Sequence, residues 1–128
     1  MAEITANVNW IAVGIGAVLS YLLGWLWYSP KLFGTKWAEG VGVSLGDASE
    51  MPVAAMLVQA LGTVALAWIV GVTAANNALL TLCLIVVTII LLMAAGGLYA
   101  KKSTYAILVE VGFVAAMTVI MVVCQAVL

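Results

Sequence analysis

Four long apolar runs constrain this chain more than any other feature. They cover about residues 8–28, 52–73, 78–100 and 104–127. A helix needs about 20 mostly apolar residues to cross the hydrocarbon core of a bilayer, and every run is long enough. None of the runs alternates apolar with polar residues as a barrel strand does. Helices are therefore the expected membrane-spanning structure.

The composition agrees with residence in a membrane. Hydrophobic residues make up 67% of the 128 residues and charged residues only 7%, against about 25% charged in a typical soluble domain. We therefore predict one domain over residues 1–128, an all-α integral membrane protein with four transmembrane helices. The connections between the last three runs are short, so these helices are expected to be antiparallel neighbours.

The basic residues predict which ends of the helices share one side of the membrane. All of them lie in the first and third connections: Lys31, Lys36, Lys101 and Lys102. The positive-inside rule then places residues 29–51 and 101–103 in the cytoplasm and both termini outside. No basic segment precedes the first run, so we expect that run to be a retained span rather than a signal peptide.

Aromatic residues crowd the end of the first run, in the stretch WLWYSPKLFGTKW at residues 25–37. We assign Trp25, Trp27 and Tyr28 to an aromatic belt at the membrane surface. Pro30 suits the first turn of a helix, and Phe33 and Trp37 are four residues apart and share a helical face. The pattern predicts a short interfacial helix over about residues 30–39, with its aromatic side toward lipid or toward the bundle.

The same stretch resembles a known family. The pair Asn9-Trp10, followed by a glycine-dotted helix that ends in WYSPKLFGTKW, is similar to the uncharacterised bacterial membrane proteins grouped as domain of unknown function 1761. The motif residues that carry the resemblance are Trp27, Tyr28, Pro30, Phe33, Gly34 and Trp37. The resemblance implies a small four-helix protein of the bacterial inner membrane over essentially the whole chain. It implies no established activity.

Glu110 is an acid inside the last apolar run, where a charge is costly. Counting inward from the predicted cytoplasmic ends places Gln59, Tyr21 and Ser20 at similar depths. These residues are candidates for an intramembrane polar site that binds a proton or a cation, in which low dielectric raises the pKa of the acid. The alternative is a structural hydrogen bond, or a shallow acid that reaches water or Lys102.

Small residues recur at helical spacing and predict close helix packing, either within the bundle or between subunits. The clearest stripe runs down the first helix with a period of four. The candidate packing positions on all four helices are Ala12, Gly16, Ser20, Gly24, Gly71, Gly96, Gly97 and Gly112.

Several function classes find no support in the sequence. The chain has no histidine and a net charge of −1, and no apolar run contains paired carboxylates, metal-ligand spacing or a phosphate loop. We expect no enzymatic activity, no metal, no cofactor and no nucleic-acid partner.

Two classes stay open. The first is an oligomeric scaffold or an accessory subunit, whose partners are the lipid bilayer, copies of itself or a larger membrane complex. The second is a small channel or transporter for protons, cations or small solutes that uses the polar cluster around Glu110. The centre of every run is nearly all apolar, which favours the scaffold.

Overall fold

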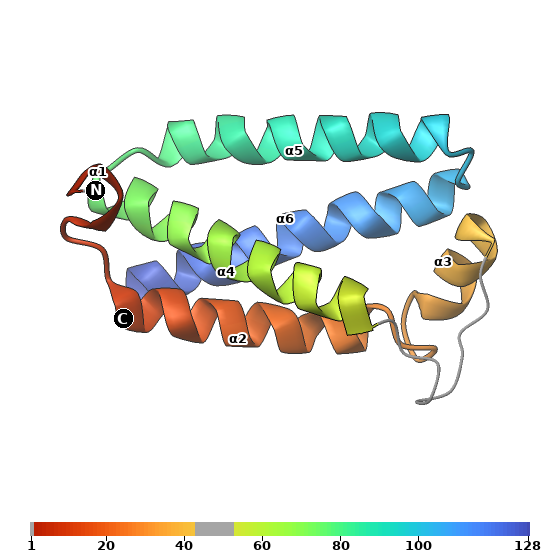
Figure 1. Cartoon of the computed structure of the whole chain (residues 1–128), viewed down its shortest axis with the longest axis horizontal. Coiled ribbons are helices and arrows are strands. Elements are labelled where there is room, and N and C mark those ends of the chain that lie inside the picture. Colours follow the sequence, from red (N-terminus) through yellow and green to blue (C-terminus); the bar gives the residue numbers. More distant parts are fainter. Residues whose placement is uncertain (1, 43–52) are drawn as a thin grey trace.

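The computed structural model describes residues 2–42 and 53–128 and is all-helical within these ranges. The six helices of this part of the chain are α1 (Ala2–Thr5), α2 (Trp10–Trp27), α3 (Gly34–Val41), α4 (Val53–Ala75), α5 (Leu79–Tyr99) and α6 (Thr104–Val127) (Figure 1). Of these, α2, α4, α5 and α6 are long and apolar enough to cross a membrane. The four predicted spans are therefore present as helices, with ends that differ from the predicted ones by a few residues.

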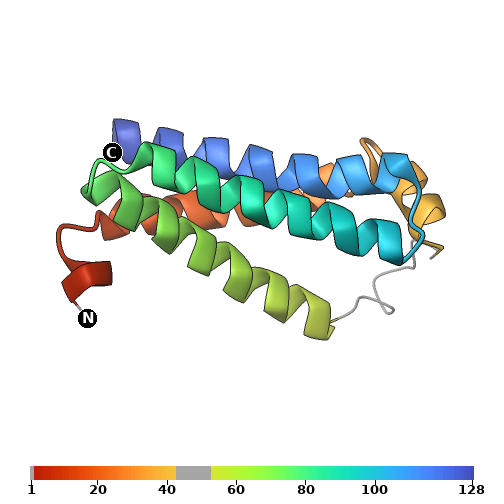
Figure 2. The same cartoon turned by 90° about the horizontal axis from the view of Figure 1, so that it is seen from above.

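The four long helices form a bundle organised around α6. Helix α6 packs against α2, α4 and α5, whereas α4 and α5 contact each other least among the neighbouring pairs. The helices α4, α5 and α6 are antiparallel neighbours joined by short turns (Figure 1). In those turns Asn77 and Lys101 take positive φ angles, of 52° and 60° respectively. Figure 2 shows that α4 lies close to α5 at the turn that joins them and diverges from it toward the other end.

All four lysines lie at one end of this bundle, which we call the lysine end. Helix α3 and the α5–α6 turn meet there, opposite the two chain termini (Figure 1). The ammonium of Lys36 lies 5.4 Å from the ring centre of Tyr105, in the first turn of α6. The grouping of the first and third connections at one end agrees with the predicted topology.

Helix α3 differs from the expected helix over residues 30–39, because it begins at Gly34 and ends at Val41. Residues 29–33 instead form a tight turn, in which the Gly34 amide donates to Ser29 O at 2.9 Å and the Phe33 amide donates to Trp27 O at 3.2 Å. Pro30 lies in this turn and not in the first turn of a helix. The short helix α1 was not predicted; its Ile4 O accepts a hydrogen bond from Trp68 Nε1 at 2.7 Å.

The small-residue stripe of α2 faces the inside of the bundle. Ala12, Gly16 and Ser20 are buried, and a Cβ at Gly16 would lie 3.4 Å from Met121 of α6. A Cβ at Gly24 would lie 3.1 Å from the ring of Phe113. The stripe therefore lets α2 and α6 approach each other within one subunit.

The remaining candidate packing glycines differ in whether a Cβ at their position would meet a neighbouring helix. A Cβ at Gly71 would lie 2.7 Å from Val13, and one at Gly112 would lie 3.5 Å from Trp27. Gly96 has nothing within 4 Å of its Cβ position. Of the predicted packing glycines, Gly96 is thus the exception that contacts no other helix among the described residues.

The neighbouring glycines Gly96 and Gly97 give a direct test of this packing. A Cβ at Gly97 would lie 2.7 Å from Cγ1 of the buried, β-branched Ile107, so we expect Gly97→Ala to destabilise the fold by about 1–3 kcal/mol through overpacking. The matched Gly96→Ala change places its methyl in open space and should leave stability nearly unchanged. Thermal unfolding in detergent measures both, and equal midpoints would contradict the α5–α6 packing.

Candidate functional site

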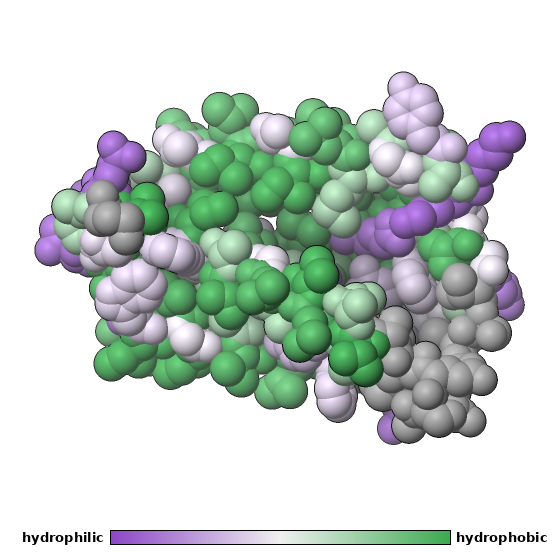
Figure 3. Space-filling view, in the orientation of Figure 1, coloured by the Kyte–Doolittle hydropathy of each residue, from purple (hydrophilic) through white to green (hydrophobic). Residues whose placement is uncertain are grey.

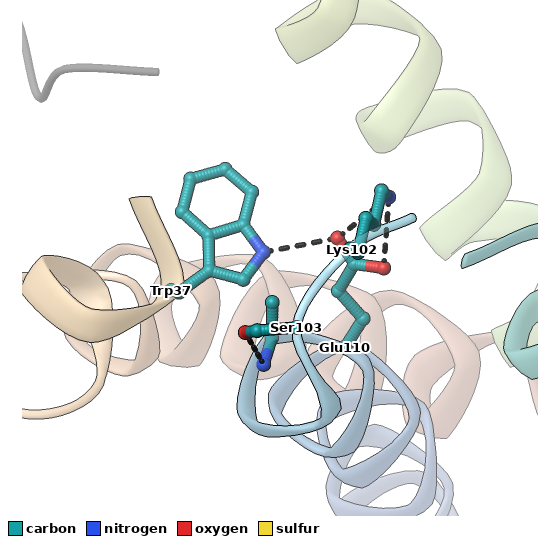
Figure 4. Close-up of polar contacts among 5 residues, drawn as sticks. Trp37, Lys102, Ser103 and Glu110 are labelled. Atoms are coloured by element: carbon teal, nitrogen blue, oxygen red, sulfur yellow. Dashed lines mark hydrogen bonds and ion pairs between the residues drawn. The ribbon is translucent and has the colours of Figure 1, made fainter. Parts of the chain in front are cut away.

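Glu110 lies inside α6, about 9 Å along the axis from the first residue of the helix, Thr104. The ammonium of Lys102 donates to both carboxylate oxygens, at 3.0 Å and 2.9 Å, and Trp37 Nε1 donates to Oε2 at 2.9 Å (Figure 4). The side chain of Glu110 is 14% exposed and that of Lys102 is 31% exposed. A long cationic side chain thus reaches down from the lysine end and neutralises a largely buried acid.

Helix α3 positions Trp37 beside this ion pair, because α3 packs against the start of α6. The Ser103 amide donates to Gly40 O at 2.9 Å, and the Ser103 hydroxyl caps α6 by accepting from the Ala106 amide at 3.0 Å. A Cβ at Gly40 would overlap the Ser103 hydroxyl and lie 2.8 Å from the Ala106 methyl. The absence of a side chain at Gly40 therefore permits the contact that positions Trp37.

Aromatic rings link α2, α3 and α6 beside the ion pair. Trp27 packs on Phe33 with 4.8 Å between ring centres, and Tyr28 packs on Trp37 at 5.0 Å and on Phe113 at 5.5 Å. These contacts turn the rings of Trp27 and Tyr28 toward the bundle, and their assignment to an aromatic belt at the membrane surface stays a prediction. Both are partly buried in the bundle, and Trp27 Nε1 donates to Val109 O at 3.0 Å. Trp25, which is 60% exposed, does point outward.

Tyr28 keeps its proton in this setting. Burial raises the pKa of the Tyr28 hydroxyl above its usual value, and the negative charge of Glu110 is a second, smaller cause in the same direction. Tyr28 is therefore a hydrogen-bond donor at any physiological pH. Among the described residues its hydroxyl has no hydrogen-bond partner, although it borders two cavities.

A cavity of about 560 Å³ opens where α4 diverges from α5, and it contains the ion pair. Its polar wall is formed by Tyr28, Gln59, Lys102 and Glu110, and its apolar wall by residues that include Ala65, Ile69, Ile89 and Met93. Figure 3 shows this arrangement as hydrophilic atoms that reach from the lysine end into a hollow of the apolar surface between α4 and α5. The cavity is thus polar at the lysine end and apolar further into the bundle.

A second, almost wholly apolar cavity of about 410 Å³ continues in the direction of the termini. It shares Ala65 and Ile69 with the first and ends near Trp68 and Ile4. On the α5 side, the residues that line the two cavities are spaced four apart: Thr81, Ile85, Ile89 and Met93. We call these two cavities together the α4–α5 groove.

A third cavity, of about 380 Å³, lies on the other side of the start of α4, toward α2 and α3. It shares Tyr28, Gln59 and Phe113 with the first cavity and is also bordered by Tyr21 and Trp37. Tyr28 of the sequence motif thus lies between two hollows, together with Gln59 and Phe113.

The four residues of the predicted polar site do not form one cluster. Glu110 and Gln59 border the same cavity, but Gln59 donates to Thr63 Oγ1 at 3.3 Å within its own helix. Tyr21 donates to Met56 O at 3.1 Å. Ser20 is fully buried in the core without a hydrogen-bond partner among the described residues. The compensation for Glu110 comes instead from Lys102, which was an open alternative, and from Trp37.

Sequence reasoning missed the apolar part of the site. Ala65, Ile69, Ile89 and Met93 are ordinary residues of apolar runs, and nothing in their spacing separates a groove wall from a lipid-facing surface. The signal for Trp37 was present, since it is a motif residue on a short amphipathic helix, but its partner was not evident.

The comparisons with known proteins identify a family. The model of the family described as Protein of unknown function (DUF1761) matches residues 11–126. No curated protein and no solved structure matches the chain. The matched region contains nearly all of α2 to α6, the ion pair and the α4–α5 groove apart from Ile4, and on this evidence the chain belongs to the DUF1761 family.

Proposed function

We propose that this protein binds one amphipathic molecule in the α4–α5 groove, without catalysing a reaction on it. The head of the molecule lies at the Lys102–Glu110 pair, and its apolar chain lies between α4 and α5. The observation that carries the proposal is that two cavities adjoin, with Ala65 and Ile69 lining both, and that polar groups border the first at the lysine end while the second is almost wholly apolar. Cavities of roughly 300–1,000 Å³ are typical of small-molecule sites.

The shape of the bundle supports this proposal. Because α4 packs mainly on α2 and α6, it leaves α5 free along much of its length (Figure 2). The groove opens sideways rather than along the bundle axis, so a molecule dissolved in the bilayer can enter it laterally. We further propose that the protein lies in the bacterial inner membrane with its lysine end in the cytoplasm, as the positive-inside rule predicts.

A transport path through one subunit is less well supported. The buried core is mostly apolar, with Leu66, Val70 and Met117 among its residues. Its buried hydroxyls at Ser20 and Thr63 are uncharged, and that of Thr63 donates to Gln59 O within its own helix. The groove is polar at one end only, and Glu110, its one carboxylate among the described residues, already accepts three hydrogen bonds. Binding without transport or catalysis fits these features better.

An oligomeric scaffold or accessory subunit stays a proposal with less support. The small residues that suggested self-association already pack against helices of the same subunit, since Gly16 and Gly24 face α6 and Gly71 faces α2.

Ala65→Phe tests the groove because Ala65 borders both of its halves. Ala65 is exposed to the groove, so the larger ring fills it without entering the core. We expect wild-type protein, released gently from its membrane, to retain a bound amphiphile in native mass spectrometry. Ala65→Phe should weaken that binding about tenfold or more, which corresponds to about 1.4 kcal/mol.

The control for this experiment is Ala115→Phe, which adds the same ring to an exposed position of α6 that borders none of the cavities described above. It should retain the ligand as the wild type does. Equal occupancy in wild type and Ala65→Phe, or no bound amphiphile in either, would overturn the proposed function.

A further inference from the structure

We infer that the ligand of the α4–α5 groove is a tailed quinone, with a flat, uncharged head that presents carbonyl oxygens. The inference deepens the proposed function and rests on it. It follows from three properties of the groove at its lysine end: the free hydrogen-bond donors, the net charge, and the types of residue that line it.

The unused hydrogen-bonding groups at the head position are mainly donors. The Lys102 ammonium has three N–H groups, and two of them are directed to Glu110. The Tyr28 hydroxyl, held protonated, has no partner among the described residues. Gln59 uses one amide N–H on Thr63 and retains the other. Tyr28 and Lys102 are only partly exposed, and a ligand that covers their free donors must offer them an acceptor to avoid the cost of unpaired groups, so the matching ligand group is a hydrogen-bond acceptor.

The charge at the head position favours an uncharged ligand. Lys102 and Glu110 form a pair without net charge, in which Glu110 is largely shielded from solvent and Lys102 is partly exposed. An anionic head would add an unbalanced negative charge beside Glu110, and a cationic head would compete with Lys102; either is disfavoured in a medium of low dielectric. A carbonyl oxygen accepts from Lys102 and Tyr28 without either cost.

The walls of the cavity suit a flat ring. Tyr28 and Phe113 border it with their rings inclined at 78° to each other, and Met93 and Met117 contribute thioethers that pack well against π faces. The apolar half of the groove, which ends near Trp68 and has a volume of about 410 Å³, suits a single tail. These features together favour a ring with one chain over a two-chain phospholipid.

Decylubiquinone provides the test, with its own reduced quinol and palmitic acid as comparison ligands. Binding to wild-type protein in detergent is measured by equilibrium dialysis, and Ala65→Phe is measured in parallel to subtract partition into the micelle. We expect the quinone to bind at least about tenfold more tightly than palmitic acid, and more tightly than the quinol, because the quinol presents hydroxyl donors to a site rich in donors.

Two variants test the head contacts. Tyr28→Phe should raise the Kd for the quinone about three- to tenfold and leave the Kd for palmitic acid nearly unchanged, since one hydrogen bond of this size is lost. The double variant Lys102→Met/Glu110→Gln removes the ammonium donor without leaving an unpaired charge, and it should weaken quinone binding at least as much.

The outcomes separate the two proposals. If palmitic acid binds more tightly than the quinone, or if neither variant changes quinone binding, the inference about the head is wrong although the groove still binds amphiphiles. If no probe binds wild type better than Ala65→Phe, the proposed function fails with it.

Discussion

Gly34→Ala is expected to lower the stability of the fold by about 3 kcal/mol, because its methyl has no room that a side chain could vacate. The added Cβ would overlap the carbonyl oxygen of Tyr28 and would lie 2.7 Å from the Tyr28 carbonyl carbon and 2.8 Å from that of Ser29. All three atoms are backbone, so the turn before α3 must open. Trp37 should then shift relative to Glu110, because this turn sets the position of α3 on the bundle.

The measurement is thermal unfolding in detergent together with the tryptophan emission spectrum, in which the partly buried Trp37 is one of five contributing tryptophans. Gly14→Ala is the matched control, since its Cβ meets nothing within 4 Å on the exposed face of α2. Gly14→Ala should change neither signal. If both variants unfold at the same temperature as wild type, the close packing of the turn against Gly34 is wrong.

Lys102→Met is expected to destabilise the protein by about 1–3 kcal/mol, the cost of leaving a buried charged group without its partner. Glu110 would retain only the Trp37 hydrogen bond, with its side chain 14% exposed. We place the loss toward the lower part of this range because Lys102 is about one third exposed and solvent screens the pair. The double variant Lys102→Met/Glu110→Gln should recover most of it, since no charge remains.

Lys101→Met is the control for this cycle. Lys101 is the neighbouring residue in the same turn, is exposed, and forms no ion pair among the described residues. Chemical or thermal unfolding measures the stability of wild type, the two single variants and the double variant. Lys101→Met should be as stable as wild type, and Lys102→Met should be less stable than both. Equal losses at the two lysines would show that general charge at the lysine end, and not the bond to Glu110, stabilises the fold.

The sequence alone determined the number of long helices, their approximate ends and the grouping of the lysines at one end. Apolar runs of this length leave a chain in lipid no other way to satisfy its backbone hydrogen bonds. The short turns before α5 and α6 make antiparallel neighbours unavoidable, and Ser103, a residue type that favours N-cap positions, caps α6. The cost of an acid in an apolar run also marked Glu110 as a residue that needs a partner.

The tertiary structure decided which faces point inward. Gly16 and Gly97 pack against neighbouring helices whereas Gly14 and Gly96 have open space, and the sequence does not separate them. In a soluble protein, polar residues mark the outer face of a helix, but lipid is as apolar as the core, so this mark is missing. For the same reason the α4–α5 groove was not foreseen. The apolar residues that line the groove are of the same types as those that face lipid, and only the divergence of α4 from α5 separates the two sets.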